Sequence, residues 1–339
     1  MTQTLLLTGD MNFQGVTDPN IPFTKVADTL RAADVVFGNL ECCFYDRADH
    51  DPGQREGFYA PPSAVGALAN HDAVGCANNV TYGEDAVMAS LAQLDQLGVA
   101  HTGAGANVDA ARQPAIIERE GRRYGMLQRT SIYWPKNQEA TISRPGVAIL
   151  KAHTAYRPRM DELAPNRPGV APEIITWADP DYLANYTAEI SALVENTDFA
   201  VASHHWGPGP DILAYQTEIA HAAIDSGAGA VMGHGPHMPL GIEIYRDRPI
   251  FYGLVNFSFD IGHHGKHGEW IGLVAQLILD GDDIQEAAFR LVRHNADNQT
   301  YFCNPAEEPE ELSIIQERSK GLGAAFNVVD DRVVIWRKS

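Results

Sequence analysis

Short apolar runs alternate with amphipathic stretches along most of the chain, a pattern typical of strands that alternate with helices. In the first half, the predicted strands are residues 5–8, 34–37, 73–76, 99–102, 114–119 and 123–128, and the predicted helices are residues 23–32, a segment after Pro62, and 84–97. In the second half, the predicted helices are residues 182–195, 215–226 and one from Pro309, and the predicted strands are 199–202, 229–232, 241–245, 249–254, 273–279, 287–292 and a closing hairpin over 328–336. This mixture of βαβ units and hairpins predicts two packed mixed sheets flanked by helices.

The alternation fails between residues 133 and 180, where prolines recur and hydrophobic periodicity is poor. A long irregular segment inside a compact protein is either a functional loop or lid, or a surface insertion without a role. No linker or internal repeat divides the rest of the sequence. We therefore predict a single domain over residues 1–339, with a Pro-rich loop insertion at about 133–180 and a C-terminal extension at about 280–339.

Side chains that bind metals follow several of the predicted strands. In open α/β sheets, ligands are usually bound at the carboxyl ends of the strands. The residues found at such ends are two carboxylates, one amide and three imidazoles: Asp10, Glu41, Asn79, His205, His234 and His237. This donor set suits a pair of Mn²⁺, Zn²⁺ or Fe ions bridged by one carboxylate. Two such ions roughly 3.5–4 Å apart can generate hydroxide at neutral pH, which is the chemistry of hydrolysis.

Composition narrows the possible partners and the compartment. Acidic residues outnumber basic ones by 44 to 25, so a formal charge of −19 opposes binding to nucleic acid or to an anionic membrane. A small anionic substrate remains compatible, because the charge of a local metal outweighs the global field. The first residues lack the pattern of a signal peptide and no apolar run is long enough to span a membrane, which predicts a cytoplasmic protein. The four cysteines show neither the spacing of a disulfide framework nor that of a structural zinc site. The sequence leaves open whether the protein forms a homo-oligomer.

The ordered set of strand-end motifs resembles the CapA family, named for capsule poly-γ-glutamate biosynthesis. The motifs are Gly9-Asp10, Asn39-Leu40-Glu41, Ala77-Asn78-Asn79, His205-Trp206-Gly207, the Gly233 to His237 turn, and Asn256-Phe257. The resemblance implies a four-layer αββα sandwich similar to calcineurin-like metallophosphoesterases. It also implies that Asp10 and His237 bind one ion, that Asn79, His205 and His234 bind the other, and that Glu41 bridges them.

Two positions depart from the related phosphoesterases. Asn12 stands where they have a histidine after the first aspartate, and Val80 stands where the family usually continues Asn-Asn with histidine. In the phosphoesterase analogy the second histidine assists the leaving group, and such general acid help is typically worth about 10²–10⁴-fold. Valine cannot provide it, so the sequence favours attack on a carbonyl substrate over efficient phosphodiester cleavage.

Five further residues are candidates for the site. His204 could replace the missing acid or simply orient its neighbour, and Asn256 is expected to support a ligand. Arg129 could clamp a substrate carboxylate or belong to a structural ion pair. His264 and His267, in the His263–His267 cluster, could bind an anionic substrate or lie in a solvated loop.

The residues and the resemblance together predict a metal-dependent hydrolase of the CapA type with two divalent ions. Its expected reaction is attack of a metal-bound hydroxide on a small carboxylate-containing amide, lactam or ester. Two alternatives remain open: a non-catalytic protein that binds or assembles a poly-γ-glutamate chain, and a phosphoesterase.

Overall fold

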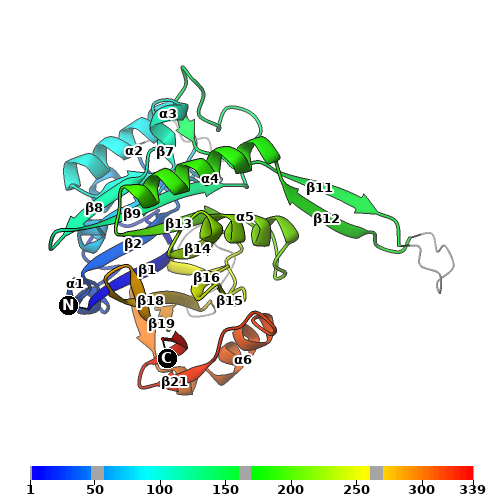
Figure 1. The fold of residues 1–339 in the computed structure, drawn as a ribbon. Coiled ribbons are helices and arrows are strands. Elements are labelled where there is room, and N and C mark those ends of the chain that lie inside the picture. The colour runs from blue at the N-terminus through cyan, green and yellow to red at the C-terminus, as the bar shows by residue number, and fades with distance from the viewer. Residues whose placement is uncertain (1, 47–56, 160–168, 260–269, 339) are drawn as a thin grey trace.

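The apolar runs form two mixed β-sheets that pack face to face, with helices on both outer faces (Figure 1). The computed structural model describes residues 2–46, 57–159, 169–259 and 270–338. This arrangement confirms the predicted α/β class and the predicted αββα sandwich. No helix within these ranges is both long and apolar enough to cross a membrane.

The larger sheet is built from strands of both ends of the chain. Its order is β21-β22-β19-β18-β1-β2-β5-β6, with β17 beside β1 and β20 beside β19. Strand β1 is parallel to β2 and β17 and antiparallel to β18, so the sheet is mixed. The strands are β1 (Gln3–Asn12), β2 (Val35–Leu40), β5 (Ala73–Gly75), β6 (Ala100–Thr102), β17 (Asn256–Phe259), β18 (Gly272–Asp280), β19 (Asp283–His294), β20 (Thr300–Cys303), β21 (Asn327–Val329) and β22 (Arg332–Arg337).

The second sheet has six strands in the order β15-β16-β14-β13-β9-β8. Its four central strands are parallel and its two edge strands are antiparallel to their neighbours. The strands are β8 (Ala115–Arg119), β9 (Arg122–Thr130), β13 (Phe199–His205), β14 (Ala230–His234), β15 (Ile242–Tyr245) and β16 (Arg248–Phe251).

Helices and short pairings complete the fold. The helices are α1 (Ala27–Ala32), α2 (Glu84–Leu97), α3 (Val108–Ala111), α4 (Pro180–Glu195), α5 (Ala214–Asp225), α6 (Pro309–Arg318) and the 3₁₀ segments η1 (Pro62–Asn70) and η2 (Pro305–Glu307). Three two-stranded pairs lie outside the large sheets: β3 (Cys43–Phe44) with β4 (Tyr59–Ala60), β7 (Ala104–Gly105) with β10 (Gly146–Val147), and β11 (Ala152–Arg157) with β12 (Glu173–Ala178).

The alternation of side chains along each strand divides the core into layers. Leu5 and Leu7 of β1 face the second sheet, where they share a buried cluster with Val201 of β13. Leu6 points outward into the cluster beneath α2, and Ala202 points outward into the cluster beneath α4 and α5. Each strand thus holds two layers together at once.

Four segments differ from the sequence-based expectation. The irregular loop expected over residues 133–180 contains β10 and the β11–β12 ribbon, which projects beyond the body of the molecule (Figure 1). The expected C-terminal extension is part of the larger sheet, since β19 to β22 pair with β18 and with one another. The helix after Pro62 is a 3₁₀ segment, and the helix expected from residue 23 begins at Ala27. The strand pattern of the ribbon was not recognisable because most of its side chains are exposed or half-buried, so its strands lack a regular alternation of buried and exposed positions.

Candidate metal centre

Five of the six predicted ligands meet at one edge of the sandwich, where parallel strands of both sheets end. Asp10 lies near the end of β1 and Glu41 directly follows β2, so the larger sheet contributes two carboxylates. His205 and His234 are the last residues of the neighbouring strands β13 and β14, and His237 lies on the turn that follows β14. The second sheet therefore contributes three imidazoles to the same edge.

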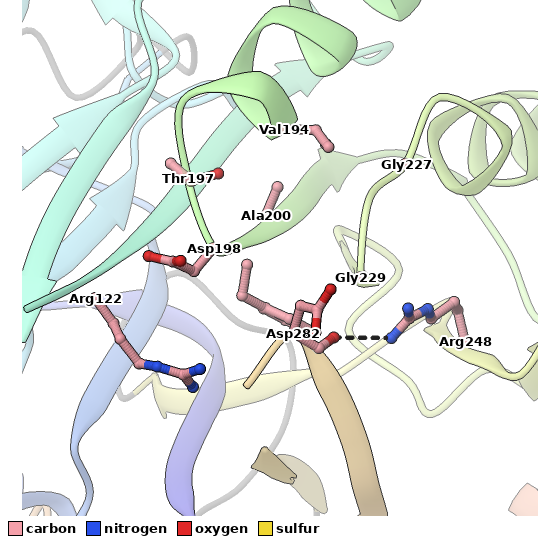
Figure 2. Close-up of a pocket in the computed structure, with 10 residues that line it drawn as sticks. Arg122, Val194, Thr197, Asp198, Ala200, Gly227, Gly229, Arg248 and Asp282 are labelled. Atoms are coloured by element: carbon pink, nitrogen blue, oxygen red, sulfur yellow. Dashed lines mark hydrogen bonds between the residues drawn. The ribbon is translucent and has the colours of Figure 1, made fainter. Parts of the chain in front are cut away.

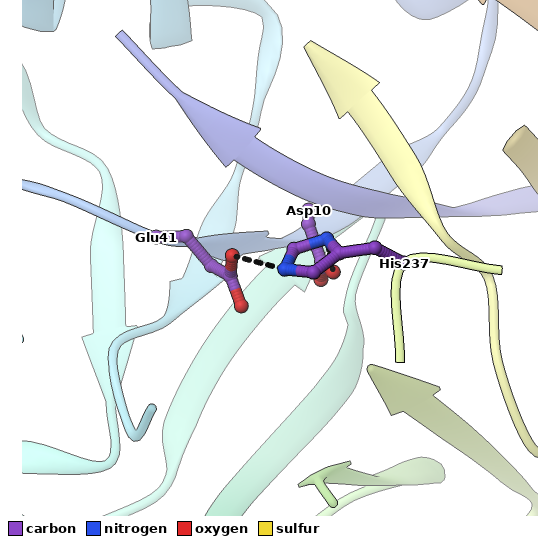
Figure 3. A group of neighbouring side chains, drawn as sticks. All are labelled: Asp10, Glu41 and His237. Carbon is purple, nitrogen blue, oxygen red and sulfur yellow. Dashed lines mark ion pairs between the residues drawn. The ribbon is translucent and has the colours of Figure 1, made fainter. Parts of the chain in front are cut away.

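Asp10, Glu41 and His237 form the centre of this group (Figure 3). Each offers a ligand atom, and these atoms lie within 4.8 Å of one another. His237 Nδ1 is 3.5 Å from Asp10 Oδ2, and His237 Nε2 is 3.7 Å from Glu41 Oε2. The other oxygen of Glu41, Oε1, is 2.7 Å from His205 Nε2, so Glu41 lies between two imidazoles.

Buried polar atoms without hydrogen bonds mark the same point. Within the described residues, Asp10 Oδ2 and both ring nitrogens of His234 have no hydrogen-bond partner, although both side chains are fully buried. His234 Nδ1 lies 3.1 Å from Asp10 Oδ1 but is not directed at it in hydrogen-bond geometry. Because unpaired buried polar groups are costly, such atoms need a partner of another kind. Carboxylate oxygens and imidazole nitrogens in this arrangement fit Mn²⁺, Zn²⁺ or Fe.

Opposite charges in the cluster shift the pKa values of two of its side chains. Burial alone would raise the pKa of Asp10, but the imidazoles of His234, His237 and His205 together hold that pKa below its ordinary value. Burial would lower the pKa of His237, while the carboxylates of Glu41 and Asp10 and the bond to Asn256 raise it. The Asp10 carboxylate and the His237 imidazole thus each favour the charged form of the other.

The backbone around the cluster adopts unusual conformations. His237 has φ 51° and Val255 has φ 63°, although neither is glycine, and Gly235 between His234 and His237 has φ 113°. A β-branched residue such as valine is rarely found in the left-handed region. These backbone conformations direct the side chains of His237 and of Asn256, which follows Val255, toward each other. Asn256 Oδ1 lies 2.8 Å from His237 Nδ1. An amide oxygen only accepts, so this bond assigns the proton to Nδ1 and leaves Nε2 to face Glu41.

The Asn78-Asn79 turn follows β5 at this edge. Asn78 is buried and structural, since its side chain donates to the Leu40 carbonyl and accepts from the backbone of Val80 and Thr81. Asn79 is half-buried and makes no hydrogen bond within the described part of the chain. Val80, in place of the family's histidine, is buried. The metal role of Asn79 stays a prediction.

Two predicted site residues point away from the cluster. Alternation along β13 sends His205 to the site and His204 to the opposite face, where it packs against Trp206 and Tyr186 and bonds Ser131. Along β9 the same rule directs Arg129 toward α4, where it is buried in an ion pair with Glu189. These contacts correct the catalytic role expected of His204 and the clamp role expected of Arg129, and they support the orienting and structural alternatives. His264 and His267 lie outside the described residues.

A cavity of about 360 Å³ lies at the other end of the second sheet (Figure 2). Phe199 and Gly229, which line it, stand at the amino ends of β13 and β14, opposite to His205 and His234. Arg248 donates to the Asp282 carbonyl at its rim. It is separate from the metal-ligand candidates.

The four cysteines are buried, and burial raises the pKa of the Cys43 thiol to about 12, so these thiols are protonated.

Sequence patterns missed three polar residues beneath the cluster: Asn39, Gln128 and Ser203. Asn39 Nδ2 donates to Asp10 Oδ1 at 2.8 Å, and Gln128 in turn donates to Asn39. Asn39 belongs to the Asn39-Leu40-Glu41 motif, and Ser203 directly follows the predicted strand 199–202. Gln128 is the last residue of the predicted strand 123–128, where a neutral amide gives no signal of a metal site.

Two packed mixed sheets with helices on their outer faces, and with carboxylates and imidazoles at the carboxyl ends of their strands, define an α/β sandwich of the αββα class. Within that class, the chain belongs to the family of the bacterial capsule synthesis protein PGA_cap, which matches residues 4–261. This confirms the CapA-type resemblance.

Individual relatives agree with this assignment. The chain is 27% identical over 285 residues to an uncharacterized protein of Sinorhizobium fredii, which covers 70% of this chain and 61% of the relative. It is 30% identical over 211 residues to a probable polyglutamine synthesis accessory protein of Mycobacterium tuberculosis, covering 60% of this chain and 49% of the relative. It is 27% identical over 248 residues to the PGA biosynthesis protein CapA of Bacillus subtilis, covering 71% and 57%.

The matched parts span from about half to three fifths of the length of these curated relatives. Among solved structures, a hypothetical protein from Thermus thermophilus superposes on 85% of this chain and 98% of its own, with a TM-score of 0.49 and 13% identity. That score is too low to carry an argument.

Proposed function

We propose that this protein is a metal-dependent hydrolase that cleaves an amide, lactam or ester bond in a small substrate bearing a carboxylate. The observation that carries the proposal is the set of buried, unpartnered donor atoms on Asp10 and His234 beside the Asp10–Glu41–His237 cluster. A buried carboxylate oxygen and buried imidazole nitrogens without hydrogen bonds are costly, and a bound cation would offset that cost. Two divalent ions at this edge are therefore part of the proposal.

Each ligand has a distinct task. Bound ions would act as Lewis acids and make water a strong nucleophile at neutral pH. Asp10 and His237 would hold one ion, His205, His234 and Asn79 the other, and Glu41 would join the two halves because it already lies between His205 and His237. Asn256 orients the His237 ring through its 2.8 Å bond to Nδ1. Its own Nδ2 is buried and has no hydrogen-bond partner among the described residues.

Two features favour a carbonyl substrate over a phosphodiester. Val80 is buried and apolar at the position where an imidazole would assist the leaving group. Asn12 uses its side chain locally, bonding the backbone and the amide of Gln14. Attack on a carbonyl carbon places the developing negative charge on the carbonyl oxygen, which bound cations and hydrogen-bond donors would stabilise. The names of relatives, PGA biosynthesis and polyglutamine synthesis, suggest γ-glutamyl amides as the first substrates to assay.

The test begins with metal content. The purified protein should bind Mn²⁺ or Zn²⁺ with a stoichiometry near two, and activity on γ-glutamyl amides, lactams or esters should vanish with chelator and return with metal. Protein that binds neither ion would end the hydrolase proposal.

A second candidate is a module that holds an acidic polyamide chain without turnover. The absence of imidazole at positions 12 and 80 favours it, because both departures remove groups expected of an active phosphoesterase. Glu41→Gln separates the two candidates: a hydrolase loses turnover with its fold intact, whereas a module keeps its binding of poly-γ-glutamate. A phosphoesterase, the weakest candidate, is tested with aryl phosphates.

A further inference from the structure

Gln128 occupies the space between the two sheets directly beneath the metal-ligand cluster. It lies in β9 and its side chain is fully buried. Gly75 in β5 leaves room for it, because a Cβ atom at Gly75 would overlap with the Gln128 amide. The side chain therefore reaches from the second sheet into the larger one.

All polar atoms of this amide are used. Gln128 Oε1 accepts from the Ala77 backbone N–H at 2.6 Å. Gln128 Nε2 donates to Asn39 Oδ1 at 2.7 Å and to Ser203 Oγ at 3.2 Å. Asn39 Nδ2 then donates to Asp10 Oδ1 at 2.8 Å. One amide thus connects the segments that carry Asp10, Asn79 and His205.

The relay has only one possible direction. The Ala77 N–H can only donate, so Gln128 must present its oxygen there and its NH₂ to Asn39. Asn39 must then present its oxygen to Gln128 and its NH₂ to Asp10. A donor on Oδ1 favours the ionised carboxylate and fixes its rotation, which leaves Oδ2, the unpartnered oxygen, directed at His237.

We propose that Gln128 is a positioning residue for the metal centre: through Asn39 it fixes the Asp10 carboxylate, and through Ala77 it fixes the turn that carries Asn79. The inference rests on the proposed metal-dependent function. Residues that form hydrogen bonds to metal ligands hold those ligands in place, and their loss typically lowers metal affinity about 10–100-fold. Gln128 would have this role for Asp10, through Asn39.

The experiment measures affinity for Mn²⁺ and Zn²⁺ by titration calorimetry, with thermal unfolding of the metal-free protein recorded in parallel. Gln128→Met keeps the length of the side chain but removes the relay, and affinity should fall by about 10–100-fold. Gln3→Met is the matched control. Gln3 is buried at the opposite end of β1 and accepts from Arg122 and Tyr124, so its loss should lower stability without changing affinity.

A double-mutant cycle distinguishes positioning from general packing. Asn39→Ala cuts the relay one step nearer to Asp10, and the double variant should bind little more weakly than Asn39→Ala alone, because residues in one network are not additive. Asn39→Ala also serves if Gln128→Met fails to fold.

The outcomes separate the two proposals. Wild-type protein without metal affinity would overturn the hydrolase and this inference together. Tight binding by wild type that is unchanged in Gln128→Met or in Asn39→Ala would overturn the inference alone. Strictly additive losses would also overturn it, since they would show that Gln128 does not act through Asn39.

Discussion

Replacing Glu41 by Gln should remove most of the stabilisation that metal gives to the fold. In the metal-free protein the change is mild, because an amide oxygen can still accept from His205 Nε2, which lies 2.7 Å from Oε1. In the metal-bound protein the loss is large, because Glu41 is the one carboxylate between the imidazoles of His205 and His237. The variant should therefore fold normally and respond weakly to metal.

The expected size follows from linkage. At a free metal concentration of 100 times Kd, each bound ion stabilises the native state by about 2.7 kcal/mol. For 339 residues the entropy of unfolding is about 0.7 kcal/mol per kelvin, so the wild-type Tm should rise by about 4 °C for each ion. If Glu41→Gln weakens binding about 100-fold, the same metal concentration contributes only about 0.4 kcal/mol per ion, or less than about 1 °C.

Differential scanning calorimetry with and without Mn²⁺ measures this increment. Glu286→Gln is a suitable control, because Glu286 is a buried carboxylate of β19 whose partners are Arg332 and Arg337. It should lower the Tm yet keep the full metal increment. A Glu41→Gln protein that retains the wild-type increment would refute the bridging role.

Three further predictions address other parts of the molecule. Burial lowers the pKa of His71 from 6.5 to about 3, so the unfolded state binds the extra proton between these values. The free energy of unfolding contributed by neutral His71 is fully present above pH 6.5 and decreases as the pH falls, by about 2 kcal/mol at pH 5. Urea unfolding as a function of pH should show this decrease in wild type and not in His71→Phe. Arg129→Met breaks the buried pair with Glu189 and should cost about 3 kcal/mol in urea unfolding while the metal increment stays constant; a lost increment would return Arg129 to the site. Val80→His should raise the rate of cleavage of phosphodiesters with poor leaving groups by up to about 10²-fold, with a smaller gain for nitrophenyl esters. If the substitution left both kinds of substrate as slow as in wild type, valine would not be the limiting feature.

Strand ends were the part of the site that sequence could reveal. Apolar runs that stop at Asp10, His205 and His234 predict both the strand and the place where its last side chain lies, because parallel strands expose their carboxyl ends at one edge. Which of two adjacent histidines faces inward could not be inferred without the phase of the strand. The structure supplies that phase: Val201 and Ser203 face the other sheet, so His205 does as well and His204 does not.

Longer-range features were beyond reach from one sequence. Gln128 contacts Asn39 and Ala77, which are 89 and 51 residues away, and no local pattern records such a bond. The pairing of β18, at residues 272–280, with the N-terminal strand β1 is similarly non-local. The β11–β12 ribbon within residues 133–180 was missed for a local reason. Most of its side chains are exposed or half-buried, so its strands show no regular alternation of apolar and polar residues.

The β11–β12 ribbon offers a place at which the chain can be divided. No third strand pairs with it among the described residues, and its outer residues Tyr156 and Ile174 are 69% and 58% exposed. A break there yields one fragment that carries Asp10, Glu41 and Gln128 and another that carries the three imidazoles. Both large sheets contain strands from each fragment, so neither fragment can complete a sheet alone. Exposed ribbons of this kind tolerate such breaks, which makes the protein a candidate for fragment complementation with metal capture as the signal of reassembly.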